Sequence, residues 1–280
     1  MTAVFHAYPA PAKLNLMLKV VGRRADGYHL LETVFRFIDY SDTVELAVRD
    51  DGVIELLNPI DGVPAERDLT VRAARLLQQH SGTPLGASIR LTKRIPMGGG
   101  LGGGSSDAAT VLLALNALWQ TAVPRETLMQ LGLKLGADVP VFIFGRNAFA
   151  TGIGEELTEL ELPEKWYVVL HPGVHVPTAE IFSSELLTRD SDISIMRILE
   201  TTQQRRNDLQ RVVTSKYPAV NEALSELEKY GSPLMTGSGS CVFLECDSEI
   251  EADKVYKTLS QKYNGFVAKG LSVHPLFDSI

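Results

Sequence analysis

Pro96-Met97-Gly98-Gly99-Gly100-Leu101-Gly102-Gly103-Gly104-Ser105-Ser106 is the most informative segment of the chain. Six of the seven residues from Gly98 to Gly104 are glycine, and such a run loses much conformational entropy when it becomes ordered. Phosphate binding explains this cost, because backbone without Cβ atoms can wrap a phosphate and direct several N–H groups at it. A helix that begins at the serines would add the partial positive charge of its amino terminus. A disordered linker fits less well, because a strand precedes the run and a helix follows it at once.

We compared the glycine segment with three well-known kinds of nucleotide-binding loop, and none of them fits. No Lys-Ser/Thr pair follows the last glycine, so the segment is not a Walker A loop. Gly98-x-Gly100-x-x-Gly103 formally matches the dinucleotide fingerprint, but no acidic residue follows at the distance of about 20 residues that this fold needs. The chain also lacks the His-Arg-Asp and Asp-Phe-Gly sets of protein kinases.

The elements on either side of the loop predict an α+β fold. Strands dominate before it, helices follow it, and the second half is mixed, without regular βαβ alternation. We expect a boundary near residue 150, with domains over residues 1–150 and 151–280. Predicted strands cover residues 12–21, 32–39, 42–49, 53–57, 88–91, 139–144, 148–151, 157–160, 166–171, 241–246 and 265–269. Predicted helices cover residues 68–80, 105–119, 124–135, 195–202, 207–214, 219–230 and 250–262.

Composition excludes some classes of protein. The chain has 280 residues, 45% of them hydrophobic and 22% charged, and its formal net charge is −7. This balance is ordinary for a soluble enzyme and argues against a general nucleic-acid binder. The amino terminus lacks a basic and then apolar leader, and no apolar stretch approaches membrane-spanning length. We therefore expect a cytoplasmic protein without a membrane or nucleic-acid partner.

The glycine segment closely resembles the phosphate loop of the GHMP kinases, the family of galactokinase, homoserine kinase and mevalonate kinase. Pro11-Ala12-Lys13-Leu14-Asn15-Leu16 resembles the amino-terminal motif of that family, and Thr236-Gly237-Ser238-Gly239-Ser240-Cys241-Val242-Phe243 resembles the carboxy-terminal motif. The resemblance implies a two-domain GHMP kinase fold. Its active site would lie in the cleft between an N-terminal ribosomal-protein-S5-like domain and a C-terminal ferredoxin-like α+β domain.

Further motifs resemble one branch of this family. They are Arg24-Ala25-Asp26-Gly27-Tyr28-His29, Leu135-Gly136-Ala137-Asp138-Val139-Pro140, Pro172-Gly173 and Gly265-Phe266-Val267-Ala268-Lys269-Gly270. That branch transfers the γ-phosphate of ATP to a hydroxyl of a cytidine-diphosphate-linked polyol in isoprenoid precursor synthesis. The resemblance therefore implies an ATP-dependent small-molecule kinase, acting as a monomer or weak homodimer.

Lys13 and Asp138 match the catalytic lysine and aspartate of the family. Phosphoryl transfer depends mainly on positioning and on neutralising charge, and an aspartate can accept the proton of the attacking hydroxyl. A neighbouring lysine favours the ionised carboxylate. Without the motifs, Lys13 would read as a surface lysine and Asp138 as a turn residue.

The same resemblance assigns binding residues. Tyr28 and Phe182 would flank a cytosine ring, which an aromatic face can stack, and His29 would contact its edge. Substrate-binding residues are then Asn15, Tyr28, His29, Pro177, Thr178 and Phe182. ATP-binding residues are Asp68, Lys93, Pro96, Met97, Gly98, Gly99, Gly100, Leu101, Gly102, Gly103, Gly104, Ser105 and Ser106.

The adenine and metal contacts are the weakest part of the resemblance. Asp68 stands where the family more often has an asparagine, and it could equally cap the following helix. Mg²⁺ is expected because it bridges the phosphates of ATP. Its protein ligands cannot be assigned, and Ser106 and Asp107 are only weak candidates.

Two other functions stay open at this point. One is another GHMP kinase, of the homoserine or mevalonate type, although such an enzyme has no need of Tyr28 and His29. The other is a nucleotide-binding regulatory domain without catalysis, which would not need Lys13 and Asp138 beside the γ-phosphate.

Overall fold

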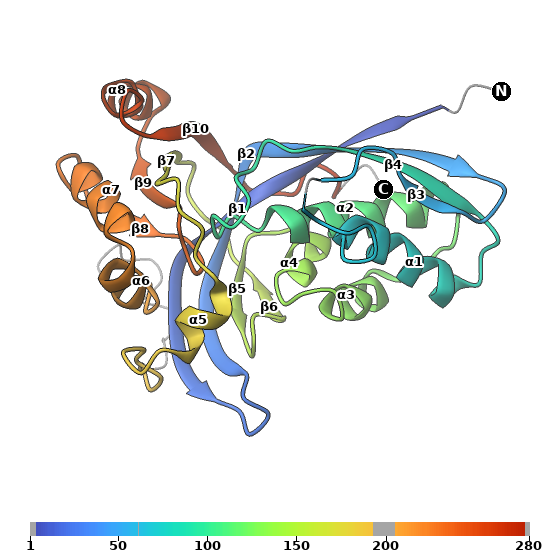
Figure 1. Cartoon of the computed structure of the whole chain (residues 1–280), viewed down its shortest axis with the longest axis horizontal. Helices are drawn as coiled ribbons and strands as arrows, with labels where there is room; N and C mark the ends of the chain where they lie inside the picture. Colours follow the sequence, from blue (N-terminus) through green and yellow to red (C-terminus); the bar gives the residue numbers. More distant parts are fainter. Residues whose placement is uncertain (1–3, 61, 193–204, 278–280) are drawn as a thin grey trace.

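The computed structural model describes residues 4–60, 62–192 and 205–277. A long β-hairpin runs through the molecule, with α1 to α4 on one side of it and α5 to α8 on the other (Figure 1). The strands are β1 (His6–Arg23), β2 (His29–Arg49), β3 (Ile54–Leu56), β4 (Gly86–Thr92), β5 (Ala148–Thr151), β6 (Glu156–Glu159), β7 (Trp166–His171), β8 (Leu234–Met235), β9 (Val242–Cys246) and β10 (Asn264–Leu271). The helices are α1 (Leu69–Ser81), α2 (Gly103–Leu118), α3 (Arg125–Leu133), α4 (Val139–Phe144), α5 (Thr178–Ser183), α6 (Gln210–Lys216), α7 (Pro218–Glu228) and α8 (Glu249–Leu259).

Strand β2 connects the two ends of the chain. It pairs with β1, β4 and β5, and also with β10, where Ile38 lies opposite Gly270 and Phe37 opposite Leu271. The pairings between named strands are antiparallel except for β3 with β4. The prediction of an α+β fold rather than a doubly wound sheet is confirmed.

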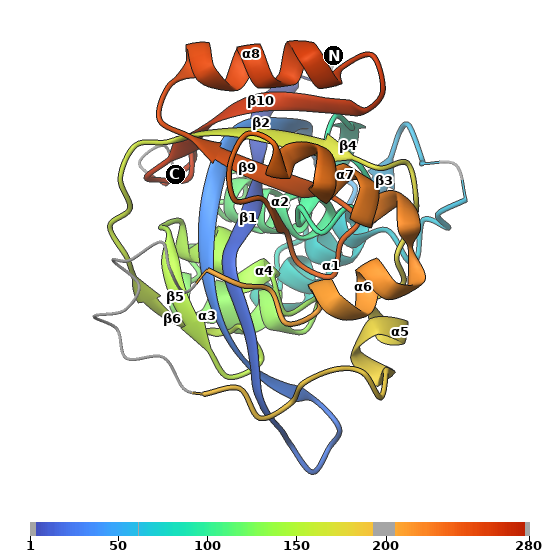
Figure 2. The ribbon, with the colours of Figure 1, turned by 90° about the vertical axis from the view of Figure 1, so that its left-hand side faces the viewer.

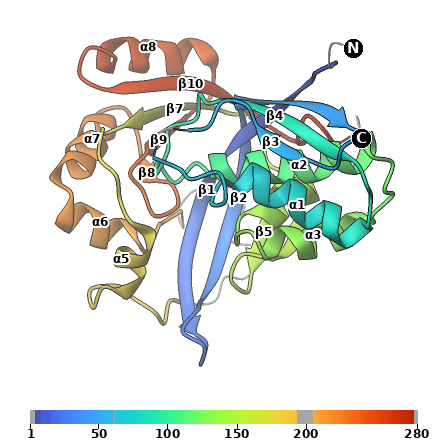
Figure 3. The same ribbon diagram turned by 45° about the vertical axis from the view of Figure 1, so that its right-hand side comes forward.

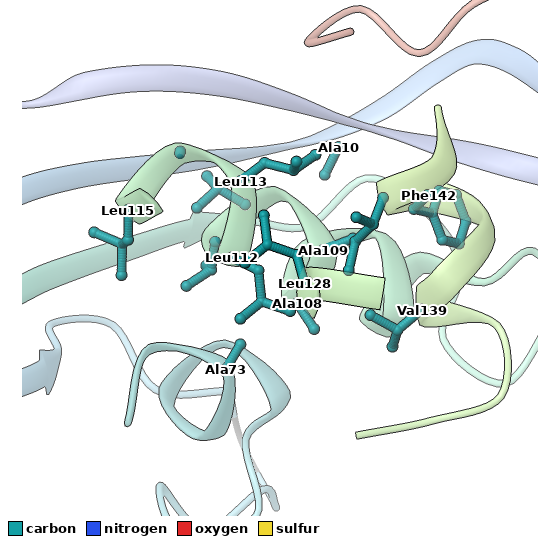
Figure 4. Close-up of a cluster of buried hydrophobic side chains, with 14 of the residues drawn as sticks. Ala10, Ala73, Ala108, Ala109, Leu112, Leu113, Leu115, Leu128, Val139 and Phe142 are labelled. Atoms are coloured by element: carbon teal, nitrogen blue, oxygen red, sulfur yellow. The ribbon is translucent and has the colours of Figure 1, made fainter. Parts of the chain in front are cut away.

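Helix α2 is the centre of the first hydrophobic core. Ala108 and Leu112 of α2 are fully buried among Ala73 of α1, Leu128 of α3 and Phe142 of α4 (Figure 4). Alanine and glycine on α2 let neighbouring helices approach closely. This packing holds the amino terminus of α2, and with it the glycine segment, in place.

A second core lies around the carboxy-terminal helices. Leu224 of α7 and Val255 of α8 pack with Val168 of β7, and α8 runs along β10 (Figure 2). Leu18 and Val20 of β1 also belong to this core. The first strand therefore contributes to both halves, and the boundary near residue 150 stays a prediction.

The prediction of a strand over residues 139–144 is wrong, because this segment forms α4. A short run of buried apolar residues shows no periodicity that separates strand from helix. Two local signals favour the helix. Pro140 lies in its first turn, and Gly145, with φ of 78°, ends it in the left-handed conformation.

The two strands predicted over residues 32–39 and 42–49 are one continuous strand, β2. Asp42 does not form a turn. Its buried carboxylate instead accepts hydrogen bonds from the backbone N–H groups of Arg94 (2.5 Å) and Ile95 (2.8 Å) just before the glycine segment.

The remaining predicted elements agree with the structure within about three residues, except that β1 begins at His6 rather than near residue 12. The helix predicted over residues 195–202 lies outside the described residues. Helix α5 and strand β8 were not predicted. Among the described helices, none is long and apolar enough to cross a membrane.

Candidate active site

A cavity of about 1100 Å³ opens where the two halves of the chain meet. The first half contributes β1, the β1–β2 turn, the start of α1 and the glycine segment to its walls. The second half contributes the segment from His175 to Ser183 and the turn from Gly237 to Gly239. The residues predicted to be catalytic, to bind ATP and to bind the acceptor therefore line one and the same cavity.

Lys13 and Asp138 meet in the wall of this cavity. The Nζ atom of Lys13 lies 3.2 Å from Oδ2 of Asp138 and donates a hydrogen bond of 2.6 Å to Oδ1 of Asn15. Lys13 is only 2% exposed, whereas the side chain of Asp138 is 37% exposed. The carboxylate stands before α4 without capping it, so it is accessible to a substrate hydroxyl.

Asn15 and Thr236 connect the three motifs of the chain. The hydroxyl oxygen of Thr236 accepts from the backbone N–H of Asn15 (3.0 Å) and lies 3.3 Å from the carbonyl oxygen of Gly100. The amide nitrogen of Asn15 donates to the hydroxyl of Thr33 (2.8 Å). The two hydrogen bonds of Asn15 are buried and the contact of Thr236 with Gly100 is partly buried, so the network fixes β1, the glycine segment and the carboxy-terminal turn relative to one another.

The glycine segment is ordered in a conformation that favours glycine. Gly98, Gly100 and Gly102 have φ values of 69°, 76° and 73°, in the left-handed region. A Cβ on Gly100 would come within 2.2 Å of the carbonyl oxygen of Thr236. The run is therefore needed for close packing as well as for backbone conformation.

Helix α2 begins at the glycine segment with free N–H groups. Gly102 occupies its N-cap position and provides no side-chain hydrogen bond, in contrast to Asp68, whose carboxylate caps α1. An uncapped amino terminus of a long helix that lines a cavity presents donors and a favourable dipole to an anion. This arrangement matches the predicted phosphate site.

Lys93, next to the glycine segment, belongs to a buried ion-pair network. Its ammonium pairs with Asp42 and, at 2.6 Å, with Oδ2 of Asp107. Burial raises the pKa of Asp107 to about 7, against the lowering effect of Lys93. The two carboxylates hold the pKa of Lys93 above its ordinary value although burial opposes this. Lys93 therefore reaches the cavity with its charge already compensated.

Asp68 lines the cavity but acts locally as a helix cap. Its Oδ1 atom accepts from the backbone N–H of Thr70 (2.8 Å) and from the Thr70 hydroxyl (2.5 Å). The capping alternative considered from the sequence is thus confirmed. An additional contact to a nucleotide base stays a prediction.

Tyr28, His29 and Phe182 gather at the other end of the cavity. Helix α5 lies beside the outer end of the hairpin (Figure 3), where the rings of His29 and Phe182 are 5.0 Å apart between centroids. Tyr28 is 60% exposed beside them. Burial, together with the charges of Arg189 and Arg23, lowers the pKa of His29. The three rings form a half-open site that suits a planar base.

Pro177 and Thr178 start α5 on the wall between the two ends. The hydroxyl of Thr178 lies 2.7 Å from that of Ser238 in the carboxy-terminal turn. This contact ties the predicted base site to the turn that packs on the glycine segment.

Nearly all the predicted site residues line the cavity, and Ser106 is the exception. Ser106 is fully buried, and its hydroxyl has no hydrogen-bond partner among the described residues. Sequence reasoning missed Arg189, which donates to His29, and the role of Asp42. Neither belongs to a recognised motif, and neither lines the cavity itself; the fold places Arg189 against His29 and Asp42 against Lys93, which do line it.

No cluster of three or more His, Cys, Asp or Glu side chains that could hold a metal occurs in the described part of the chain. The other oxygen of Asp107, Oδ1, is buried without a partner there.

Two models of one protein family match this chain, one in its first half and one in its second half. The family model described as GHMP kinases N terminal domain matches residues 68–146, and that described as GHMP kinases C terminal matches residues 185–265. A curated protein of Chromobacterium violaceum is 73% identical over 278 residues, which cover 98% of each chain. The chain belongs to the GHMP kinase family.

Two curated relatives of this GHMP kinase carry the same name. The Chromobacterium violaceum protein and a protein of Neisseria meningitidis, 56% identical over 96% of each chain, are both named 4-diphosphocytidyl-2-C-methyl-D-erythritol kinase. The resemblance inferred from the motifs is confirmed.

Solved structures extend the comparison to the fold. A crystal structure of 4-(cytidine 5'-diphospho)-2C-methyl-D-erythritol kinase matches with a TM-score of 0.82 and 36% identity, and covers 95% of this chain and 99% of that one. A mevalonate kinase structure matches with a TM-score of 0.68 at 15% identity, which shows a shared fold only. The predicted two-domain GHMP kinase fold is confirmed.

Proposed function

We propose that this chain phosphorylates the 2-hydroxyl of 4-diphosphocytidyl-2-C-methyl-D-erythritol with ATP. The products are the 2-phosphate and ADP, and the step belongs to the methylerythritol phosphate pathway of isoprenoid precursor synthesis. One observation carries the proposal: the Lys13–Asp138 pair lies in the same cavity as the glycine segment and the Tyr28–His29–Phe182 site. The names of the 73% and 56% identical relatives support the same substrate.

Asp138 would act as the base. Its carboxylate accepts the proton of the attacking hydroxyl as the oxygen forms its bond to the γ-phosphorus and the bond to ADP breaks. The exposed position of Asp138 admits the acceptor. Lys13, buried and bound by both Asp138 and Asn15, orients this carboxylate and contributes positive charge where the phosphoryl group passes.

The glycine segment and the start of α2 would hold the phosphates of ATP. Free N–H groups and the helix dipole stabilise negative charge without rearrangement, which is what a loose phosphoryl-transfer transition state requires. Residues from Pro96 to Ser105 line this part of the cavity. Buried Ser106 would support the loop from behind rather than contact the nucleotide.

The base of the acceptor would bind at the far end of the same cavity. Tyr28 and Phe182 provide aromatic faces, and His29 provides a ring nitrogen for the base edge. Pro177 and Thr178 would line the path of the diphosphate between the two ends. Stacking of a base on such side chains contributes about 1–3 kcal/mol.

Mg²⁺ fits the charge pattern of the site. Lys93 is paired with two carboxylates and Lys13 with one, so the phosphates of ATP need positive charge beyond what these two lysines supply. Asp107, with one buried oxygen lacking a partner in the described residues, is the protein group best suited to the ion. When bound beside Asp107, Mg²⁺ would supply positive charge that offsets the negative charge of the phosphates.

Three further properties belong to the proposal. We propose a cytoplasmic enzyme, active as a monomer or weak homodimer, with two domains that divide near residue 150. Another GHMP acceptor and a silent regulatory domain are the alternatives. Among them, only the cytidylyl kinase uses both the aromatic site and the Lys13–Asp138 pair.

An ATP-consumption assay with Mg²⁺ tests the proposal. It compares 4-diphosphocytidyl-2-C-methyl-D-erythritol with homoserine, mevalonate and galactose as acceptors. We expect turnover with the cytidylyl compound alone. Turnover with another acceptor would refute the base site, and binding of ATP without turnover on any acceptor would favour the regulatory alternative.

A further inference from the structure

Arg189 follows α5 and is held by three backbone carbonyl groups. Its guanidinium nitrogens donate to the carbonyl oxygens of Leu187 (3.1 Å), Phe182 (3.0 Å) and Ser184 (2.8 Å). These contacts fix the guanidinium in one orientation. The mechanism proposed above gives Arg189 no role.

The third guanidinium nitrogen of Arg189 points at His29. Its Nε atom donates to Nε2 of His29 over 3.1 Å. An arginine has donors only, so Nε2 of His29 must accept and cannot carry a proton. The neutral imidazole then has its proton on Nδ1, which has no protein partner among the described residues.

The charges around His29 support a neutral ring. Arg189 and, from the end of β1, Arg23 lower its pKa, in addition to burial. Asp26 and Tyr28 lie on the same cavity wall, and Asp26 pairs with Arg24 at 2.7 Å. A doubly protonated His29 would also lose the hydrogen bond to Arg189.

We propose that Arg189 is a positioning residue that holds His29 in the Nδ1–H tautomer and so sets the base preference of the acceptor site. The proposal rests on the proposed function for the identity of the base. An Nδ1–H donor suits N3 of cytosine, which is an acceptor. It opposes N3 of uracil, which carries a hydrogen, so the fixed tautomer favours cytosine over uracil.

The ¹⁵N signals of the histidine side chains test the tautomer without any substrate. The protein has six histidines, and a His29→Gln variant assigns the signal of His29. We expect protonated Nδ1 and unprotonated Nε2 in the wild type. In Arg189→Met, which removes the donor but keeps a long side chain, we expect the proton to redistribute to Nε2. Protonated Nε2 in the wild type would overturn the proposal.

Steady-state kinetics test the consequence for recognition. In Arg189→Met we expect KM for the cytidylyl substrate to rise about tenfold, the value of one hydrogen bond, with KM for ATP unchanged. The preference in kcat/KM for the cytidylyl substrate over its uridylyl analogue should fall by a similar factor.

Two further variants separate positioning from a general loss of structure. Arg189→Lys keeps a donor for Nε2 and should restore most of the base preference, whereas Arg211→Gln, an exposed change on α6, should change neither KM. Equal increases in both KM values with an unchanged base preference would show a merely structural role. An inactive wild type would refute the proposed function, and the ¹⁵N signals would still decide the tautomer.

Discussion

Lys13 Nζ lies 3.2 Å from Asp138 Oδ2, and the same ammonium donates to Asn15 at 2.6 Å. The strand β1 brings the lysine and the start of α4 brings the aspartate. The ammonium is buried, whereas the carboxylate is partly exposed. This asymmetry leaves the carboxylate as the member of the pair that can receive a proton from a substrate.

Replacing the proposed base should separate catalysis from binding. In Asp138→Asn we expect kcat to fall by about 10²–10⁴-fold, the usual contribution of a general base. The affinity for ATP, measured by calorimetry with Mg²⁺, should stay near wild type. Asp247→Asn is the matched control, since Asp247 is exposed and pairs with Lys165 away from the cavity. Unchanged turnover in Asp138→Asn would disprove the assignment of the base.

Gly102 tests the packing of the glycine segment against Lys13. A Cβ at this position would lie 3.1 Å from Cε of Lys13 and 3.0 Å from Cζ of Phe142. In Gly102→Ala we therefore expect the lysine to be displaced and turnover to fall by about 100-fold. The expected cause is a shift of Lys13 rather than a direct block of the phosphate position.

Gly82→Ala controls for backbone strain. Gly82 has a similar φ of 69°, but nothing lies within 4 Å of a Cβ there. Both variants should lose about 1–2 kcal/mol in the free energy of unfolding, because alanine disfavours the left-handed conformation. Equal turnover in the two variants would argue against the contact between Gly102 and Lys13.

Thr236 should matter through its hydroxyl. Thr236→Val keeps the shape but leaves the buried N–H of Asn15 without its acceptor. We expect a loss of about 1–3 kcal/mol in the free energy of unfolding by urea, and a higher KM for ATP because Gly100 also loses its contact. Thr214→Val, whose hydroxyl bonds only within α6, is the control. A variant of wild-type stability would contradict the bridging role of this threonine.

His274 should make the protein less stable in mild acid. Burial, and then the charge of Arg125, lowers its pKa to about 3 from an ordinary value of 6.5. The unfolded chain then binds a proton below pH 6.5 that the folded chain does not, so stability falls as the pH decreases. At pH 5 the loss from this group is about 2 kcal/mol relative to pH 7.

Variants at His274 and at an exposed histidine separate the contribution of His274 from that of other titrating groups. The free energy of unfolding of His274→Asn should depend less steeply on pH between 7 and 5 than that of the wild type. His80→Gln, at an exposed position on α1, should keep the wild-type dependence. Parallel curves for His274→Asn and the wild type would show that His274 is protonated in the folded state.

The motifs were readable from the sequence because their chemistry is local. The glycine-rich segment from Gly98 to Gly104 predicted a phosphate loop from its own chemistry, and the resemblance of the motifs around Lys13 and Asp138 to the GHMP kinases predicted the catalytic pair. The predicted α+β class followed in the same way from the order of strands and helices. These features depend on backbone freedom and side-chain type, which neighbouring residues largely determine.

Only the tertiary structure decided how these parts meet. The apolar run over residues 139–144 has no periodicity that separates strand from helix, and the structure shows it as the helix α4 with residues 139–143 buried. Asp42 and Lys93 form their ion pair because β2 and the segment after β4 lie side by side. Arg189 reaches His29 because α5 packs on the end of the hairpin. Such contacts join residues distant in sequence, and they depend on the packing of the whole chain rather than on local propensity.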